Sequence, residues 1–275
     1  MPEANNPNQE IKGRFNPVHH MKTDSKTLIH RSSSGARLVE IFDRENFRYL
    51  YFNTRFLQSK MALDAPHLLL LPYTRYMMLS LMFLPDPKRI LLIGLGAGSL
   101  LRYISTMFPD CRIDAVDHSQ EIIDLARGYF KLPETDNVSV YCRDGVAFLE
   151  NRVDGEPYDI ILLDAFDELG IADVIYNRDF FTTCRKHLTE DGILCSNLWS
   201  GSTSELTRVT RELAECFAGN FTCPVPNRGN VIGYSFKHET GPDTFAGDHK
   251  ITEELQARFG LDFKDMKQRL IRHNF

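Results

Sequence analysis

The stretch Ile90-Leu-Leu-Ile-Gly94-Leu-Gly96-Ala-Gly98 decides the fold of this chain. Four consecutive apolar residues are typical of a strand that is buried on both faces of a parallel sheet. The glycine turn that follows lets a ligand approach the main chain closely and exposes the N–H groups of the next helix, predicted from 99 to 108. The stretch therefore predicts a strand–turn–helix unit that can bind a ligand at its turn.

The same alternation continues toward the C-terminus. Apolar strands are predicted at 112–117, 138–142, 158–164 and 193–198, and helices with one apolar side are predicted between them at 119–130, 146–151 and 180–188. Strands that alternate with helices in this way form a doubly wound, mostly parallel α/β sheet. A helix opened by the capping box Ser202-Thr-Ser-Glu205, a strand at 230–237 and two short helices complete the prediction.

The segment before this alternation has a different texture. Residues 1–23 are polar and rich in Asn and Pro, which predicts a disordered tail. Two runs rich in aromatic and β-branched residues, 38–42 and 47–52, flank a polar turn and predict a hairpin. We therefore expect a small antiparallel β module over 24–66 and a larger α/β domain over 67–275.

Composition excludes several classes of protein. The 275 residues carry a net charge of −5 and are 43% hydrophobic, which excludes wholesale disorder and gives no electrostatic basis for binding nucleic acid or an anionic membrane. We find neither a membrane-spanning run nor a secretory signal. No two of the six cysteines form a CxxC pair, which favours reduced thiols and a cytoplasmic location, and no metal-ligand set is present.

The strand that follows the glycine turn indicates which kind of ligand the turn binds. Asp117 ends the second parallel strand, 19 residues after Gly98, where its carboxylate can accept hydrogen bonds from both hydroxyls of a ribose. The backbone of Gly94, Gly96 and Gly98 together with this acid predicts a nucleoside-binding site. Asp144-Gly145 follows the third strand, where Asp144 can accept a hydrogen bond from an adenine amino group or can cap the next helix.

Carboxylates gather after the fourth strand. Asp164, Asp167, Glu168 and Asp173 fall within ten residues, at the sheet edge where ligands of open α/β sheets bind. A partly buried carboxylate at this edge can act as a general base with a raised pKa, and its neighbours can hold a cationic amine.

The stretch from about 50 to 198 resembles the polyamine aminopropyltransferases, the spermidine synthase family, and most closely their bacterial spermidine-synthase-like relatives. The resemblance is carried by Leu57-Gln58, the glycine loop, Val116-Asp117, Asp144-Gly145 and Asp164-Ala-Phe-Asp167-Glu-Leu-Gly170. It implies a Rossmann-like fold of the class I methyltransferase type and a homodimer. It also implies that Asp164 is the base for the attacking amine, while Asp167, Asp173 and Gln58 bind the small cationic amine substrate.

The sequence leaves the reaction open among three hypotheses. The first is aminopropyl transfer from decarboxylated S-adenosylmethionine to a polyamine amine, which the pair Asp164 and Asp167 favours. The second is methyl transfer from S-adenosylmethionine, because the loop aspartate that pairs with the donor's ammonium in the family corresponds to Ala97 here. The third is a non-catalytic nucleoside-binding relative, because the family's Tyr-His pair has no clean match in 63–68.

Overall fold

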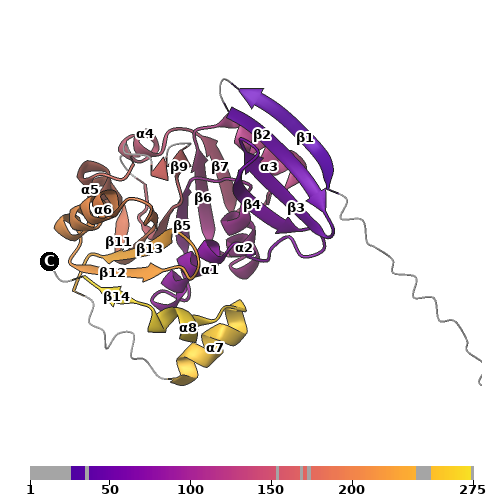
Figure 1. Cartoon of the computed structure of the whole chain (residues 1–275). Coiled ribbons are helices and arrows are strands. Elements are labelled where there is room, and N and C mark those ends of the chain that lie inside the picture. Colours follow the sequence, from indigo (N-terminus) through magenta and orange to yellow (C-terminus); the bar gives the residue numbers. More distant parts are fainter. Residues whose placement is uncertain are drawn as a thin grey trace, which may run out of the picture.

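The structure is a computed structural model that describes residues 26–34, 37–152, 155–167, 170–171, 175–239 and 249–273. The predicted tail at 1–23 lies outside these residues. The predicted parallel strands lie in one eight-stranded sheet of order β14-β12-β13-β11-β8-β5-β6-β7 (Figure 1). Its strands are β5 (Arg89–Ile93), β6 (Arg112–Asp117), β7 (Val138–Cys142), β8 (Tyr158–Leu163), β11 (Leu188–Trp199), β12 (Gly219–Pro224), β13 (Asn230–Phe236) and β14 (Ile271–Arg272).

The five strands from β11 to β7 run parallel, and β13, β12 and β14 add an antiparallel edge. Alternate side chains of each strand point to opposite faces, so both faces of the sheet are apolar and each needs a covering layer. The predicted α/β fold with a doubly wound, mostly parallel sheet is confirmed.

Helices cover both faces. One face packs against α1 (Pro72–Met77), the 3-10 helix η1 (Met78–Met82), α2 (Ser99–Met107), α3 (Gln120–Tyr129), α7 (His249–Phe259) and α8 (Phe263–Gln268). The other face packs against α4 (Gly145–Glu150), α5 (Arg178–Lys186) and α6 (Thr203–Cys216). Figure 1 shows α7 and α8 in yellow, away from α5 and α6.

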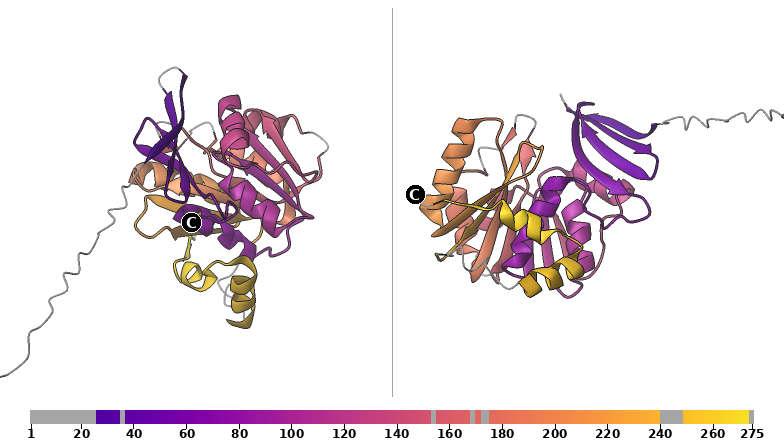
Figure 2. Two further views of the ribbon diagram at one scale, coloured as in Figure 1. Left: turned by 90° about the vertical axis from the view of Figure 1, so that its right-hand side faces the viewer. Right: turned by 60° about the horizontal axis from the view of Figure 1, so that its bottom comes forward.

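The N-terminal module is a second sheet. Strands β1 (Thr27–Ser34), β2 (Arg37–Arg44), β3 (Phe47–Phe52) and β4 (Phe56–Ala62) pair in sequence order and antiparallel. Figure 2 shows this sheet in indigo beside the central one. Its inner face, with Val39, Ile41, Leu50 and Met61, packs on Leu125, Phe130 and the glycine loop. The antiparallel β module is therefore confirmed as an element that touches the predicted ligand loop.

Several segments differ from the expected secondary structure, and two of them lie in the central sheet beside β13. The segment Glu190-Asp191-Gly192, which follows the helix predicted at 180–188 and was expected to lie between it and the next strand, lies inside β11, where the pairing with β8 breaks between Leu188 and Ile193. The strand β12 was not expected at all. Its sequence, Gly-Asn-Phe-Thr-Cys-Pro, contains both Gly and Pro, which are depleted in strands, so local propensity argued against it.

The six cysteines are all free thiols, and four of them are buried. Within the described residues, no helix is long and apolar enough to cross a membrane. The described side chains also form no group of three or more that could hold a metal ion.

Candidate active site

The glycine loop lies directly against the end of β8. Gly94 has a φ of 91°, in the left-handed region, and its N–H donates to the carbonyl of Val116 at 2.9 Å. A Cβ atom at this position would lie 2.2 Å from the backbone oxygen of Asp164. Only glycine permits so close an approach. The glycine loop, which is predicted to bind the nucleoside, therefore lies against Asp164, the predicted base.

Asp117 is joined to the same loop. One oxygen of its carboxylate accepts the N–H of Leu95 at 2.9 Å, and the other accepts the N–H of Ser119 at 2.9 Å. These bonds fix the carboxylate between the loop and the start of α3. Each oxygen keeps a second lone pair, so the geometry is compatible with the predicted bonds to ribose hydroxyls.

Asp144 caps α4. Its side chain accepts a hydrogen bond from the N–H of Ala147 at 3.0 Å, and Asp144 is exposed to solvent. The capping bond uses one oxygen of the carboxylate, so the cap and the predicted contact with adenine can coexist. Gly145 is required by packing, since a Cβ there would lie 2.8 Å from Ile93.

Asp164 sits half-buried at the carboxyl end of β8 and accepts two hydrogen bonds. The Tyr73 hydroxyl donates to one oxygen at 3.2 Å, and the Asn197 amide donates to the other at 2.8 Å. Tyr73 comes from the first turn of α1, and Asn197 from the end of β11. Three elements that are far apart in the sequence therefore position this one carboxylate.

Burial changes the acidity of this cluster. It raises the pKa of Asp164 to about 6, even though the hydrogen bonds from Asn197 and Tyr73 lower it. Burial and the nearby Asp164 charge raise the pKa of Tyr73 well above its ordinary value, so Tyr73 stays a neutral donor. A carboxylate with a pKa near 6 is ionised at neutral pH and is a better proton acceptor than an ordinary aspartate.

The N-terminal sheet reaches the loop through β4. The Ser59 hydroxyl accepts the N–H of Ala97 at 3.2 Å. The neighbouring Gln58 is the extra residue of a β-bulge, because Leu50 pairs with Ser59 whereas Tyr51 pairs with Leu57. Bulges redirect side chains, and this one lies beside the loop to which the predicted substrate ligand Gln58 must contribute.

Ala97 does not line an open site. It is 1% exposed and packs with the inner face of the N-terminal sheet, including Leu50 and Met61. Behind it, the buried Arg102 guanidinium donates to the carbonyls of Ala97, Pro66 at 2.8 Å and Phe130 at 2.7 Å. The position that carries an acid in the resembled family is therefore part of an apolar contact in this protein.

The structure describes no side chain for two of the predicted amine ligands. Asp173 falls in 172–174, outside the described residues. Asp167 belongs to the short strand β9 (Phe166–Asp167), which pairs with β10 (Gly170–Ile171), and only its backbone is described. Their roles remain predictions.

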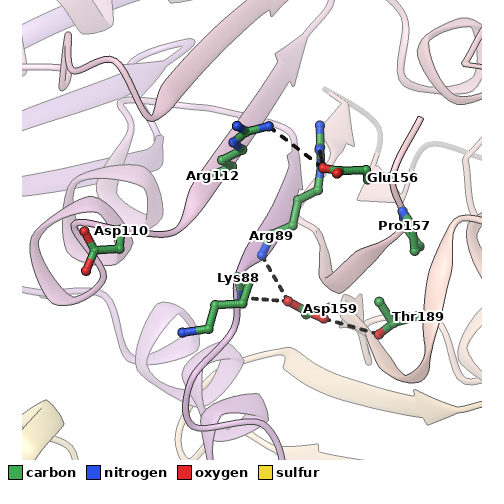
Figure 3. Close-up of a pocket in the computed structure, with 8 residues that line it drawn as sticks. All are labelled: Lys88, Arg89, Asp110, Arg112, Glu156, Pro157, Asp159 and Thr189. Atoms are coloured by element: carbon green, nitrogen blue, oxygen red, sulfur yellow. Dashed lines mark hydrogen bonds and ion pairs between the residues drawn. The ribbon is translucent and has the colours of Figure 1, made fainter. Parts of the chain in front are cut away.

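A cavity of about 480 Å³ lies at the opposite end of the parallel strands (Figure 3). Its lining includes Arg89 and Arg112, the first residues of β5 and β6. Asp159 accepts the backbone N–H groups of Lys88 and Arg89 there. None of the predicted site residues lines this cavity, so it is separate from the candidate active site.

Sequence reasoning missed Tyr73 and Asn230. Tyr73 follows Pro72, and a proline at the start of a helix was a signal that the next side chain begins a turn, but not that it would face Asp164. Asn230 begins β13 and donates to the side-chain oxygen of Asn197 at 3.0 Å. No local pattern could reveal that contact, because 33 residues separate its partners.

A family model described as "Spermine/spermidine synthase domain" matches residues 71–239. The chain is 36% identical over 238 residues to a protein of Chromobacterium violaceum named polyamine aminopropyltransferase, covering 86% of this chain and 90% of that protein.

Two solved structures share the fold. A probable spermidine synthase from Corynebacterium glutamicum superposes with a TM-score of 0.71 at 20% identity, covering 82% of this chain and 86% of that one. Human methyltransferase-like protein 13, in complex with SAH, superposes with a TM-score of 0.64 at 19% identity, covering 70% of this chain and 93% of that one. The fold is therefore shared with a protein named as a probable spermidine synthase and with one named as a methyltransferase-like protein.

Proposed function

This chain belongs to the spermine/spermidine synthase family, and on that premise we propose that it transfers an aminopropyl group from decarboxylated S-adenosylmethionine to a polyamine amine. The observation that carries the proposal is the half-buried Asp164 carboxylate, placed against the Gly94 turn and held by Tyr73 and Asn197. The 36% identity over nearly the whole length of a polyamine aminopropyltransferase favours this reaction over methyl transfer.

The chemistry requires a base at this place. An alkylammonium has a pKa near 10.4 in water, so the acceptor arrives protonated and has no lone pair for attack. The Asp164 carboxylate attracts the cation and takes one proton. The freed nitrogen lone pair then forms a bond to the aminopropyl carbon beside the sulfonium. The carbon–sulfur bond breaks, its electron pair goes to sulfur, and methylthioadenosine leaves.

The other predicted residues bind the two substrates. In this proposal, Asp117 accepts the ribose hydroxyls and Asp144 accepts the adenine amino group. The backbone of Gly94, Gly96 and Gly98 lines the nucleoside, with Gly145 letting α4 approach β5. The acceptor amine is held at its distal ammonium by Asp167 and Asp173 and at its other side by Gln58.

The remaining predictions are part of the same proposal. Residues 24–66 and 67–275 form two domains, two chains form a homodimer, and the enzyme works in the cytoplasm without nucleic-acid or membrane partners. The dimer follows from the family resemblance and is tested by sedimentation of the whole chain.

The first prediction tests Asp164 as the base. Asp164→Asn keeps the shape of the side chain but removes its proton-accepting charge, so turnover should fall 10²–10⁴-fold. Methylthioadenosine release with putrescine or a longer polyamine measures turnover, and calorimetry measures the affinity for methylthioadenosine, which should stay within about threefold because the ribose and adenine contacts are intact.

Asp179→Asn is the matched control, because Asp179 is exposed in the first turn of α5. It should retain normal turnover. Near-normal turnover of Asp164→Asn would leave Asp164 a structural residue. If the unmodified protein released S-adenosylhomocysteine from S-adenosylmethionine, and no methylthioadenosine with any amine, methyl transfer would replace the proposal.

A further inference from the structure

Three side chains form a directional chain of hydrogen bonds that ends at the predicted base. The Asn230 amide nitrogen donates to the side-chain oxygen of Asn197 at 3.0 Å, and the Asn197 amide nitrogen donates to Asp164 at 2.8 Å. An amide has a donor end and an acceptor end, whereas an ionised carboxylate only accepts. The order of donors and acceptors therefore decides whether Asn197 stabilises the Asp164 charge or opposes it.

The sheet brings these residues onto one face. In the antiparallel pair of β11 and β13, Trp199 lies opposite Asn230 and Asn197 lies opposite Ile232. Asn230 is thus the diagonal neighbour of Asn197, and diagonal neighbours share a face of the sheet. It approaches Asn197 from the side away from Asp164.

The Asn197 side chain has no access to water that could replace these partners, because Asn197 is 1% exposed. Without Asn230, its side-chain oxygen would be buried without this donor, which is costly. In the flipped orientation, the same oxygen would face the Asp164 carboxylate. Every polar atom in these two contacts meets a complementary one only when Asn230 donates and Asn197 presents its NH2 group to Asp164.

We propose that Asn230 is a positioning residue for the reaction: it holds the Asn197 amide with its nitrogen toward the Asp164 carboxylate. The proposal deepens the function given above and rests on Asp164 being its base. Asn230 acts through Asn197 and touches neither substrate in this scheme.

None of the described titratable groups around Asp164 carries a charge at pH 7, so the donation by the Asn197 amide is one of the main influences on the ionisation of Asp164. Among the described residues, these groups are Tyr73 on α1, Tyr176 before α5 and Cys195 on β11. Burial raises the pKa of each well above its ordinary value, so all three are neutral at pH 7. No described lysine or arginine contributes to the pKa of Asp164, whose hydrogen-bond donors are Asn197 and Tyr73.

The second prediction replaces Asn230 by Asp, which has the same shape but accepts only. Asn197 must then turn its nitrogen toward residue 230 and its oxygen toward Asp164. The Asp164 carboxylate loses a donor worth about one pH unit or more, and the new charge at residue 230 opposes its ionisation further. Its titration midpoint should therefore rise from about 6 to about 7 or higher. In the pH profile of kcat/KM, the midpoint of the acid limb should move to higher pH by the same amount. At pH values above the new midpoint, activity should be restored.

The midpoint is read directly from the carboxyl ¹³C signal that disappears in Asp164→Asn. This NMR measurement does not depend on catalysis, so it tests the positioning role even if the proposed reaction proves wrong. A second variant, Asn230→Ala, removes the donor without adding a charge and should shift the midpoint in the same direction by less.

Asn220→Asp is the matched control. It makes the same change in the neighbouring strand, opposite Ser235 and five residues along β13 from Asn230, or about 17 Å. Its Asp164 midpoint should stay where it is in the unmodified protein. The proposal is overturned if the Asn230 variants leave the midpoint unchanged, or if they lower kcat equally at every pH.

Discussion

At the scale of single residues, the site is decided by how Asp164 is solvated. Its carboxylate exchanges water for one phenol and one amide, and burial outweighs both, so its pKa lies at about 6. An unfolded aspartate has a pKa near 3.9. The raised value means that folding favours the neutral form, and that the ionised form needed by a base costs stability.

The third prediction follows from the sign of this shift. The stabilising preference for protonated Asp164 is complete below about pH 4 and is lost as pH rises through about 6. Asp164→Asn never ionises, so it should be more stable than the unmodified protein by about 3 kcal/mol at pH 7.5, and the gain should shrink toward zero near pH 4. Urea unfolding at several pH values measures the difference.

Asp179→Asn again serves as the control, because it makes the same chemical change at an exposed position and should not gain about 3 kcal/mol at pH 7.5. A pH-independent gain for Asp164→Asn would mean that the Asp164 carboxyl titrates normally in the folded state.

At the scale of elements, the ends of neighbouring parallel strands gather the site. Gly94, Asp144 and Asp164 follow β5, β7 and β8, and Asp117 is the last residue of β6. Two of these residues also stabilise the helices that follow. Asp144 caps α4, and Asp117 accepts the N–H of Ser119, the cap residue of α3. The same two carboxylates thus stabilise the starts of α3 and α4 and are the proposed ligands of the nucleoside.

The fourth prediction separates these two roles at Asp144. Asp144→Ala removes the cap and should cost about 1 kcal/mol of stability, whereas Asp144→Ser preserves a good cap and should cost little. Both variants lose the carboxylate, so both should bind methylthioadenosine more weakly by a similar factor, measured by calorimetry.

A methylthioadenosine analogue without the adenine amino group supplies the check. The unmodified protein should bind it about as weakly as the variants bind methylthioadenosine. If Asp144→Ser keeps full affinity, Asp144 is a cap alone.

At the scale of the whole molecule, one buried cation joins three parts. Arg102 on α2 is 3% exposed and donates to the segment after the N-terminal sheet at Pro66, to the glycine loop at Ala97 and to the end of α3 at Phe130. Burial lowers its pKa to about 10, so it remains charged. These bonds hold the small sheet in place over the loop.

The fifth prediction removes the Arg102 guanidinium and its hydrogen bonds to the three segments. Arg102→Met fills much of the same volume but takes this donor from three carbonyls, two of them buried, which should cost about 3 kcal/mol or more in urea unfolding. The affinity for methylthioadenosine should fall as well, because the loop loses its support.

Arg75→Met is the control, since the exposed Arg75 donates one hydrogen bond, to Leu69, and should cost under about 1.5 kcal/mol. Equal losses for the two variants would show that Arg102 does not join the parts.

Much of this protein is determined by local sequence. The apolar run before Gly94 predicted a buried strand because a strand covered on both faces must be apolar throughout. The alternation that follows predicted the parallel sheet. Parallel strands bring their carboxyl ends to one edge, so the placement of Asp117, Asp144 and Asp164 at that edge followed from the pattern alone.

Tertiary structure decided how those residues are surrounded. Tyr73 on α1 and Asn197 on β11 donate to Asp164, and Asn230 on β13 donates to Asn197. Side chains so distant in sequence leave no local pattern. The burial of Ala97 likewise depends on a sheet that arrives from another part of the chain. Sequence periodicity records which face of an element is covered, whereas the partner that covers it, and hence the pKa of a carboxylate, is set only when the elements pack.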